Sequence, residues 1–194
     1  GYLIADGDKI PDKGELTYRG INIEDIVRGC DAEDRFGFEE VAWLLIFGHL
    51  PTRSQYEGFS RLLFENRELP EYFPEDMIIK APSKNIMNKL ARSVLALYSY
   101  DDSPDDLSLE NNMRQSISLI ARMPSIMSYA YQVKRRHFDR ESMFFHPYEP
   151  DHATAEAILN ALRPDRKFTH QEAKLLDLLM VLHAEHGGGN NSTF

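Results

Sequence analysis

The stretch Thr169-His-Gln-Glu172-Ala-Lys-Leu175-Leu-Asp177-Leu-Leu-Met-Val-Leu182 decides the fold class of this 194-residue chain. Thr169 and Glu172 have the spacing of a capping box, in which each side chain accepts a hydrogen bond from the other residue's backbone N–H, so they predict the start of a helix. From Leu175 to Leu182 only Asp177 interrupts a run of apolar residues. A helix that is apolar on nearly every side needs neighbours all round it, so we expect it at the centre of a larger molecule or at a subunit interface.

Helical periodicity covers most of the remaining chain from Ile23 onward. Besides the helix that begins at Thr169, the predicted helices cover residues 38–49, 52–66, 83–100, 107–122, 124–136 and 152–163. Met123-Pro124 is expected to divide two of them, because proline is tolerated in a first helical turn but not inside a helix. The first twenty residues alternate short apolar stretches with turn formers, which predicts a small β-hairpin. We therefore expect a mainly α fold, a single piece over residues 1–194, with a small N-terminal β-hairpin.

Composition excludes several classes of protein. A formal net charge of -9 and a pI near 5.2 argue against a nucleic-acid binder, which normally presents a basic face to phosphates. Cys30 is the only cysteine, so no internal disulfide can form and a reducing compartment fits better. The apolar run from Val41 to Phe47 is far shorter than the roughly 20 residues that span a bilayer. We expect no membrane partner.

The predicted last helix leads into His183-Ala-Glu-His186-Gly-Gly-Gly-Asn190. The two histidines are three residues apart, which places them on one helical face near the last turn, and the glycines let a ligand approach the main chain closely. Three interpretations stay open. The histidines can be core residues bonded to backbone, they can bind zinc together with Glu185, or they can join Asn190 in hydrogen-bonding a small dicarboxylate or keto acid.

The segment from His183 to Phe194 closely resembles the part of citrate synthases in which His-x-x-His, a glycine-rich turn and an Asn meet oxaloacetate. Gly14-Glu-Leu-Thr-Tyr-Arg-Gly-Ile-Asn-Ile-Glu-Asp-Ile26 resembles the N-terminal signature of the same family, and residues 38–51 resemble the stretch that follows it there. Three matches in the same order along the chain make it similar to the citrate synthase family.

This resemblance implies a mostly helical homodimer with a large and a small domain, which condenses acetyl-CoA with oxaloacetate to citrate and CoA. The chemistry is general acid–base catalysis on a carbon acid, with acetyl-CoA as a co-substrate and no metal or other cofactor. The chain would be the N-terminal part of the large domain, without the small domain and the C-terminal part. Its location would be the cytoplasm, or the mitochondrial matrix in a eukaryote.

His186 is the best match to an oxaloacetate contact of the family, and His183 and Asn190 follow. None of the three is expected to be catalytic, because the family's catalytic histidine lies in a Gly-Pro-Leu-His-Gly segment that does not occur here. The arginines that clamp the carboxylates are also expected beyond residue 194, and both ends of the chain, Gly1 and Phe194, look cut. We therefore expect the chain to be inactive alone.

Three rival hypotheses are kept. The first is a 2-methylcitrate synthase, which resembles citrate synthase in fold and mechanism and uses propionyl-CoA. The second is a non-catalytic helical homologue that acts as an interaction module, and the third is a metal-binding helical protein. Rates with the two thioesters, the sequence that follows Phe194 in the gene, and bound zinc would distinguish them.

Overall fold

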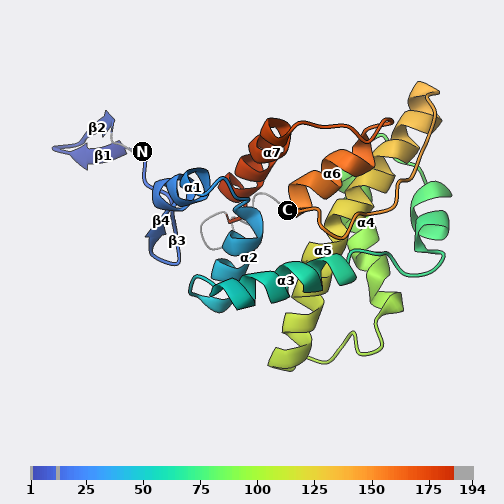
Figure 1. Cartoon of the computed structure of the whole chain (residues 1–194), viewed down its shortest axis with the longest axis horizontal. Helices are drawn as coiled ribbons and strands as arrows, with labels where there is room; N and C mark the ends of the chain where they lie inside the picture. Colours follow the sequence, from blue (N-terminus) through green and yellow to red (C-terminus); the bar gives the residue numbers. More distant parts are fainter. Residues whose placement is uncertain (1, 12–13, 186–194) are drawn as a thin grey trace. The chain divides into compact units, whose positions relative to one another are not determined.

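A computed structural model of the chain describes residues 2–11 and 14–185 (Figure 1). The elements in chain order are β1 (Tyr2–Ala5), β2 (Asp8–Pro11), β3 (Thr17–Tyr18), β4 (Ile21–Asn22), α1 (Ile23–Ala32), α2 (Phe38–Phe47), α3 (Arg53–Glu65), the π-helical turn η1 (Pro74–Ile79), α4 (Ile86–Leu97), the 3₁₀ turn η2 (Tyr98–Tyr100), α5 (Leu109–Lys134), the π-helical turn η3 (Arg135–Asp139), α6 (Thr154–Leu162) and α7 (His170–Leu182). The predicted mainly α fold with an N-terminal β-hairpin is confirmed. Within the described ranges, every helix is too short or too polar to cross a membrane.

Two antiparallel hairpins stand at the start of the chain, β1 with β2 and β3 with β4. Asp6 and Gly7 connect the first pair with φ angles of 53° and 91°, and Arg19 and Gly20 connect the second with 49° and 83°. Two central residues with positive φ make the type I′ turn, whose twist matches that of paired strands. The first hairpin is the predicted one, and the second was not predicted.

The predicted capping box at Thr169 and Glu172 is present, and a second one begins α3. The Thr52 N–H donates to Gln55 Oε1 at 2.8 Å and the Gln55 N–H donates to Thr52 Oγ1 at 3.3 Å, at the start of α3. At the start of α7 the Thr169 N–H donates to Glu172 Oε2 at 2.7 Å and the Glu172 N–H donates to Thr169 Oγ1 at 3.2 Å. Hydrogen bonds from the Arg163 guanidinium and from Thr169 lower the pKa of Glu172 to about 2. The carboxylate therefore stays charged at the positive end of the helix.

The predicted break at Met123-Pro124 is wrong. A single helix, α5, runs for 26 residues with Pro124 inside it. Proline within a helix removes one backbone hydrogen bond and costs about 3 kcal/mol. Pro124 is buried, and α4, α6 and η1 all pack against α5 (Figure 1). Burial of apolar surface along so long a helix offsets the local cost of one proline.

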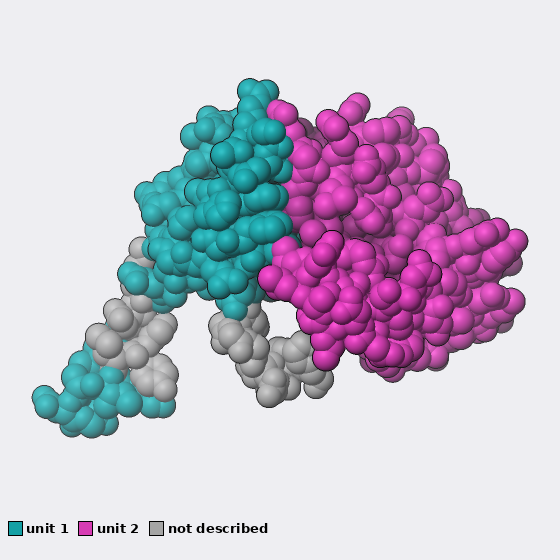
Figure 2. All heavy atoms as spheres, turned by 90° about the horizontal axis from the view of Figure 1, so that it is seen from below, with its two compact units in different colours: residues 1–56, 174–194 teal, residues 57–173 magenta. Residues whose placement is uncertain are grey.

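The chain divides into two units, which Figure 2 distinguishes by colour. Unit 1 contains residues 1–56 and 174–194, and unit 2 contains residues 57–173. The core of unit 1 joins seven buried side chains, namely Tyr18, Ile23, Ile26, Cys30, Val41, Leu44 and Val181. The core of unit 2 joins Leu69, Phe73, Ile78, Leu97, Ile126, Ala130 and Val133. Unit 1 thus combines the first 56 residues with α7 from Lys174 onward, and the predicted site follows α7.

Candidate functional site

His183 is the one predicted site residue within the described ranges. It lies one residue beyond α7, its side chain is exposed, and its ring Nδ1 is 2.7 Å from the Leu179 carbonyl oxygen. A carbonyl oxygen can only accept, so Nδ1 carries the proton and Nε2 is the ring atom left to meet a ligand. His186 and Asn190 lie outside the described residues.

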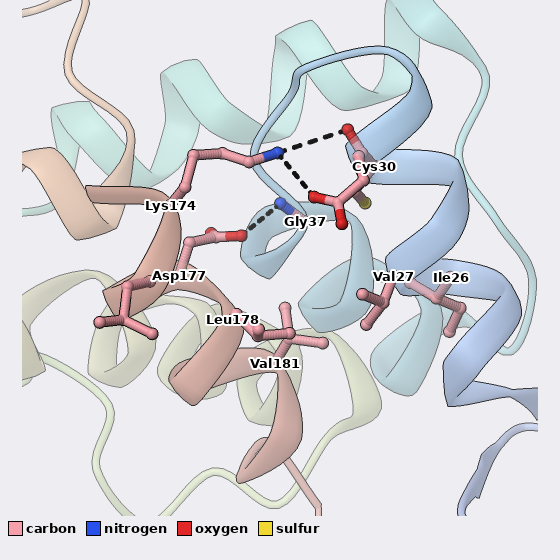
Figure 3. A pocket seen from close by; sticks show the side chains of 10 residues that line it. Ile26, Val27, Cys30, Gly37, Lys174, Asp177, Leu178 and Val181 are labelled. Atoms are coloured by element: carbon pink, nitrogen blue, oxygen red, sulfur yellow. Dashed lines mark hydrogen bonds and ion pairs between the residues drawn. The ribbon is translucent and has the colours of Figure 1, made fainter. Parts of the chain in front are cut away.

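Asp177 fixes α7 to the start of α2 from 140 residues away in the sequence. Its Oδ2 accepts a hydrogen bond from the Gly37 N–H at 2.7 Å (Figure 3). Its Oδ1 accepts one from the Phe38 N–H at 3.0 Å. Gly37 is the N-cap of α2 and has no side chain to cap the helix, so the Asp177 carboxylate supplies acceptors for the N–H groups of the cap residue and of the first helical residue. Burial raises the pKa of the Asp177 carboxyl to about 6, although the two N–H donors act in the opposite direction.

Lys174 fixes the same helix to the end of α1. Its Nζ donates to the Arg35 carbonyl oxygen at 2.9 Å and lies 3.4 Å from an Asp31 carboxylate oxygen. It also donates to the Cys30 carbonyl oxygen at 3.4 Å (Figure 3). The last carbonyls of a helix carry partial negative charge, so an ammonium group there is favourable. Lys174 and Asp177 together hold the part of α7 that belongs to unit 1 against α1 and α2 in one register.

A cavity of about 150 Å³ lies beside these contacts. Its walls are mainly aliphatic, and Figure 3 shows Ile26, Val27, Leu178 and Val181 around it. The one thiol in the wall, Cys30, is buried, and burial raises its pKa, so it is not an activated nucleophile. The cavity contains none of the predicted site residues, and we interpret it as a packing feature of unit 1.

Tyr18 and Arg19, in the N-terminal signature, have distinct physical roles in unit 1. The buried Tyr18 hydroxyl donates to the Val181 carbonyl oxygen at 2.8 Å, in the last turn of α7. The Arg19 guanidinium donates to the Leu45 carbonyl oxygen through Nε at 3.1 Å and Nη2 at 2.6 Å, near the end of α2. Residues near the two ends of the described chain are thereby joined directly.

The sequence predicts His183 as a site residue, and this stays a prediction; it does not predict that Tyr18, Lys174 and Asp177 join α7 to the rest of unit 1. Asp177 was interpreted as a mere interruption of an apolar helix. The available signal was a single acidic residue on an otherwise apolar face, together with a helix that begins after a glycine and therefore lacks its own cap.

A second cavity and the metal-ligand geometry of the described residues complete the description of the site. A cavity of about 450 Å³ in unit 2 lies between the end of α4 and α5. Over residues 2–11 and 14–185, no group of three or more His, Cys, Asp or Glu side chains is placed to hold a metal ion. The zinc hypothesis of His183, Glu185 and His186 stays a prediction, because His186 lies outside these residues.

A family model described as "Citrate synthase, C-terminal domain" matches residues 5–194. A citrate synthase from Haloferax volcanii is 33% identical over 192 residues, which cover 94% of this chain and 46% of that protein. A 2-methylcitrate synthase from Shewanella oneidensis is 26% identical over 179 residues, which cover 92% of this chain and 44% of that protein. The crystal structure of a citrate synthase from Pyrobaculum aerophilum matches with a TM-score of 0.75 and 26% identity, covering 89% of this chain and 42% of that one.

The chain spans less than half the length of each of these three proteins. The family match nevertheless covers every described element from β2 to α7, and with them Tyr18, Lys174, Asp177 and His183. On this match, the chain belongs to the citrate synthase family.

Proposed function

We propose that the protein to which this chain belongs condenses acetyl-CoA with oxaloacetate to give citrate and CoA. The observation that carries the proposal is the position of His183, which follows α7 directly with its Nδ1 bound to the Leu179 carbonyl and its Nε2 left for a ligand. Family membership and the 33% identity to a citrate synthase support the same assignment. We take the chain to be the N-terminal part of the large domain.

His183, His186 and Asn190 are proposed to contact oxaloacetate. Imidazole N–H groups and a side-chain amide can donate hydrogen bonds to the carboxylate and keto oxygens of this ligand. None of the three is proposed as the acid or base that removes a proton from the acetyl group. The chain lacks the Gly-Pro-Leu-His-Gly segment of the catalytic histidine, so the 194 residues are proposed to be inactive alone.

Release of the CoA thiol tests this function. The whole protein and the 194-residue chain are each given oxaloacetate with acetyl-CoA, and then with propionyl-CoA. We expect thiol release by the whole protein and none by the chain, because three neighbouring polar residues cannot replace the missing acid–base groups. Silence of the folded whole protein with both thioesters would contradict the proposal and favour the non-catalytic interaction module.

The second candidate function is 2-methylcitrate synthesis from propionyl-CoA, which the match to the Shewanella oneidensis protein favours. The two thioesters differ by one methylene group, whose burial in an apolar pocket is worth about 0.8 kcal/mol or somewhat more. The ratio of kcat/KM for propionyl-CoA to kcat/KM for acetyl-CoA therefore distinguishes the two functions. A higher kcat/KM for propionyl-CoA would assign 2-methylcitrate synthesis.

We also propose that the protein is a homodimer. Leu175, Leu179 and Leu182 follow one another at spacings of four and three on α7, and they are 60%, 46% and 39% exposed. An exposed apolar stripe of this kind favours association. A monomeric mass of the whole protein in light scattering would contradict the dimer.

A further inference from the structure

The end of α7 tightens over three residues. The His183 N–H is shared between the Leu179 carbonyl at 3.2 Å and the Met180 carbonyl at 3.3 Å, and the Ala184 N–H bonds to the Val181 carbonyl at 3.3 Å. The hydrogen bonds thus change from a spacing of four residues to a spacing of three, as is common in a last helical turn.

The Val181 carbonyl is the acceptor at which α7 stops. A carbonyl oxygen has two lone pairs, and here one receives the Ala184 N–H while the other receives the Tyr18 hydroxyl at 2.8 Å. In a helix that continued, the same oxygen would accept the N–H of Glu185, four residues on. Both lone pairs of the Val181 carbonyl oxygen already accept hydrogen bonds, so the oxygen has no lone pair left for the Glu185 N–H.

The backbone N–H groups that follow α7 also influence the Tyr18 hydroxyl. Burial raises the pKa of Tyr18, while hydrogen bonds from the backbone N–H groups of Glu185 and Ala184 lower it. A side chain that inserts into the ladder of four-residue hydrogen bonds is a known cause of helix bends and ends. The Tyr18 hydroxyl, which donates to the Val181 carbonyl at 2.8 Å in the last turn of α7, is such a side chain.

Tyr18 is itself held rigidly enough to act on α7. Its side chain is 1% exposed in the core of unit 1, and its strand is paired through the type I′ turn at Arg19 and Gly20. The Arg19 guanidinium anchors that turn to the Leu45 carbonyl. A hydroxyl so placed has little freedom to follow a helix that lengthens.

We propose that Tyr18 is a positioning residue: its hydroxyl ends α7 at Leu182 and sets the direction in which the chain leaves the helix at His183. The structural part of this inference stands on the hydrogen bonds alone. Its kinetic consequence, a correctly oriented oxaloacetate contact, rests on the proposed function.

Tyr18→Phe in the whole protein tests the inference, because it removes one oxygen atom and keeps the ring in the core. The crystal structure of the variant is expected to show α7 lengthened, with the Glu185 N–H bonded to the Val181 carbonyl. The KM for oxaloacetate is expected to rise roughly tenfold, the effect of about one misplaced hydrogen bond, with the KM for acetyl-CoA unchanged. The exposed Tyr72, changed to Phe, is the matched control and should alter neither quantity.

A second substitution separates positioning from stability. Tyr18→p-aminophenylalanine keeps an N–H donor at the same reach and is expected to restore both the helix end and the KM for oxaloacetate. A Tyr18→Phe structure with α7 still ending at Leu182, or an unchanged KM with a lengthened helix, would overturn the positioning role. If the wild-type protein makes no citrate but the helix lengthens in the variant, the structural assignment of Tyr18 holds and the proposed function fails.

Discussion

Replacement of Asp177 by alanine is expected to lower the free energy of unfolding by about 3 kcal/mol near pH 5, because two backbone N–H groups at the start of α2 lose their acceptor. The Gly37 N–H and the Phe38 N–H both donate to this carboxyl, and Asp177 is 5% exposed. Water therefore cannot replace the lost bonds easily. Denaturant unfolding of the wild type and the variant measures the difference.

Asp177→Asn is the matched control, since it keeps the shape and one acceptor oxygen. We expect roughly half the loss of the alanine variant, because one amide oxygen serves one N–H group well. Equal stability of the wild type and the alanine variant at this pH would show that the carboxyl does not cap α2.

The same carboxyl gives the stability a pH dependence of known sign. Its pKa in the folded chain is about 6, against an ordinary value of 3.8, so the folded state keeps this proton over a range where the unfolded state has lost it. Stability linked to Asp177 is then fully present below about pH 4 and is lost as the pH rises through 6, a change on the order of 3 kcal/mol. Asp177→Asn should abolish this slope, and a slope that persists in the variant would assign it to other groups.

Replacement of Gly37 by alanine is expected to cost about 2 kcal/mol by overpacking. An added Cβ would meet Cys30 Sγ at 2.9 Å, Val181 Cγ2 at 3.4 Å and an Asp177 carboxylate oxygen at 3.6 Å. The first of these distances is shorter than a normal contact, so a residue of α1 or α7 has to move. Thermal and denaturant unfolding measure the loss.

Gly58→Ala is the control of opposite sign. Gly58 lies inside α3, where an added Cβ meets nothing within 4 Å, and alanine in a helix interior is expected to add about 0.5–1 kcal/mol to the free energy of unfolding.

Cys30→Ala combined with Gly37→Ala should recover at least about 1 kcal/mol of the free energy of unfolding relative to the sum of the single changes, because contacting residues are coupled. Simple additivity in this cycle would contradict the contact with Cys30.

Local signals in the sequence were sufficient for most of the helices. Both capping boxes are made by neighbouring residues, and Gly48 ends α2 with a φ of 82°, as its position after an apolar run indicates. Pro124 misled the prediction, because a local rule cannot weigh the packing that α5 gains along its whole length. The type I′ turn at Arg19 and Gly20 was not predicted, because a positive φ at arginine has no strong sequence signal.

The candidate site was predictable only as a motif. His183, His186, Asn190 and the glycines between them predict the segment as a site through their resemblance to the family motif, and this stays a prediction. The bonds that position its start join residues 140 and 163 apart, from Asp177 to Gly37 and from Tyr18 to Val181. No periodicity within one helix reports a partner at that separation, so these contacts required the fold.

The central claim is that the segment from His183 to Asn190 binds oxaloacetate, and calorimetric titration of the whole protein with oxaloacetate tests it most directly. The wild type is compared with the His186→Ala variant. His49→Ala, at an exposed histidine outside the motif, is the control. The account predicts that oxaloacetate binds the wild type and the control equally and binds His186→Ala at least about tenfold more weakly, the usual effect of losing one hydrogen bond to a charged ligand. An unchanged dissociation constant in His186→Ala would contradict the assignment of this segment to the oxaloacetate site.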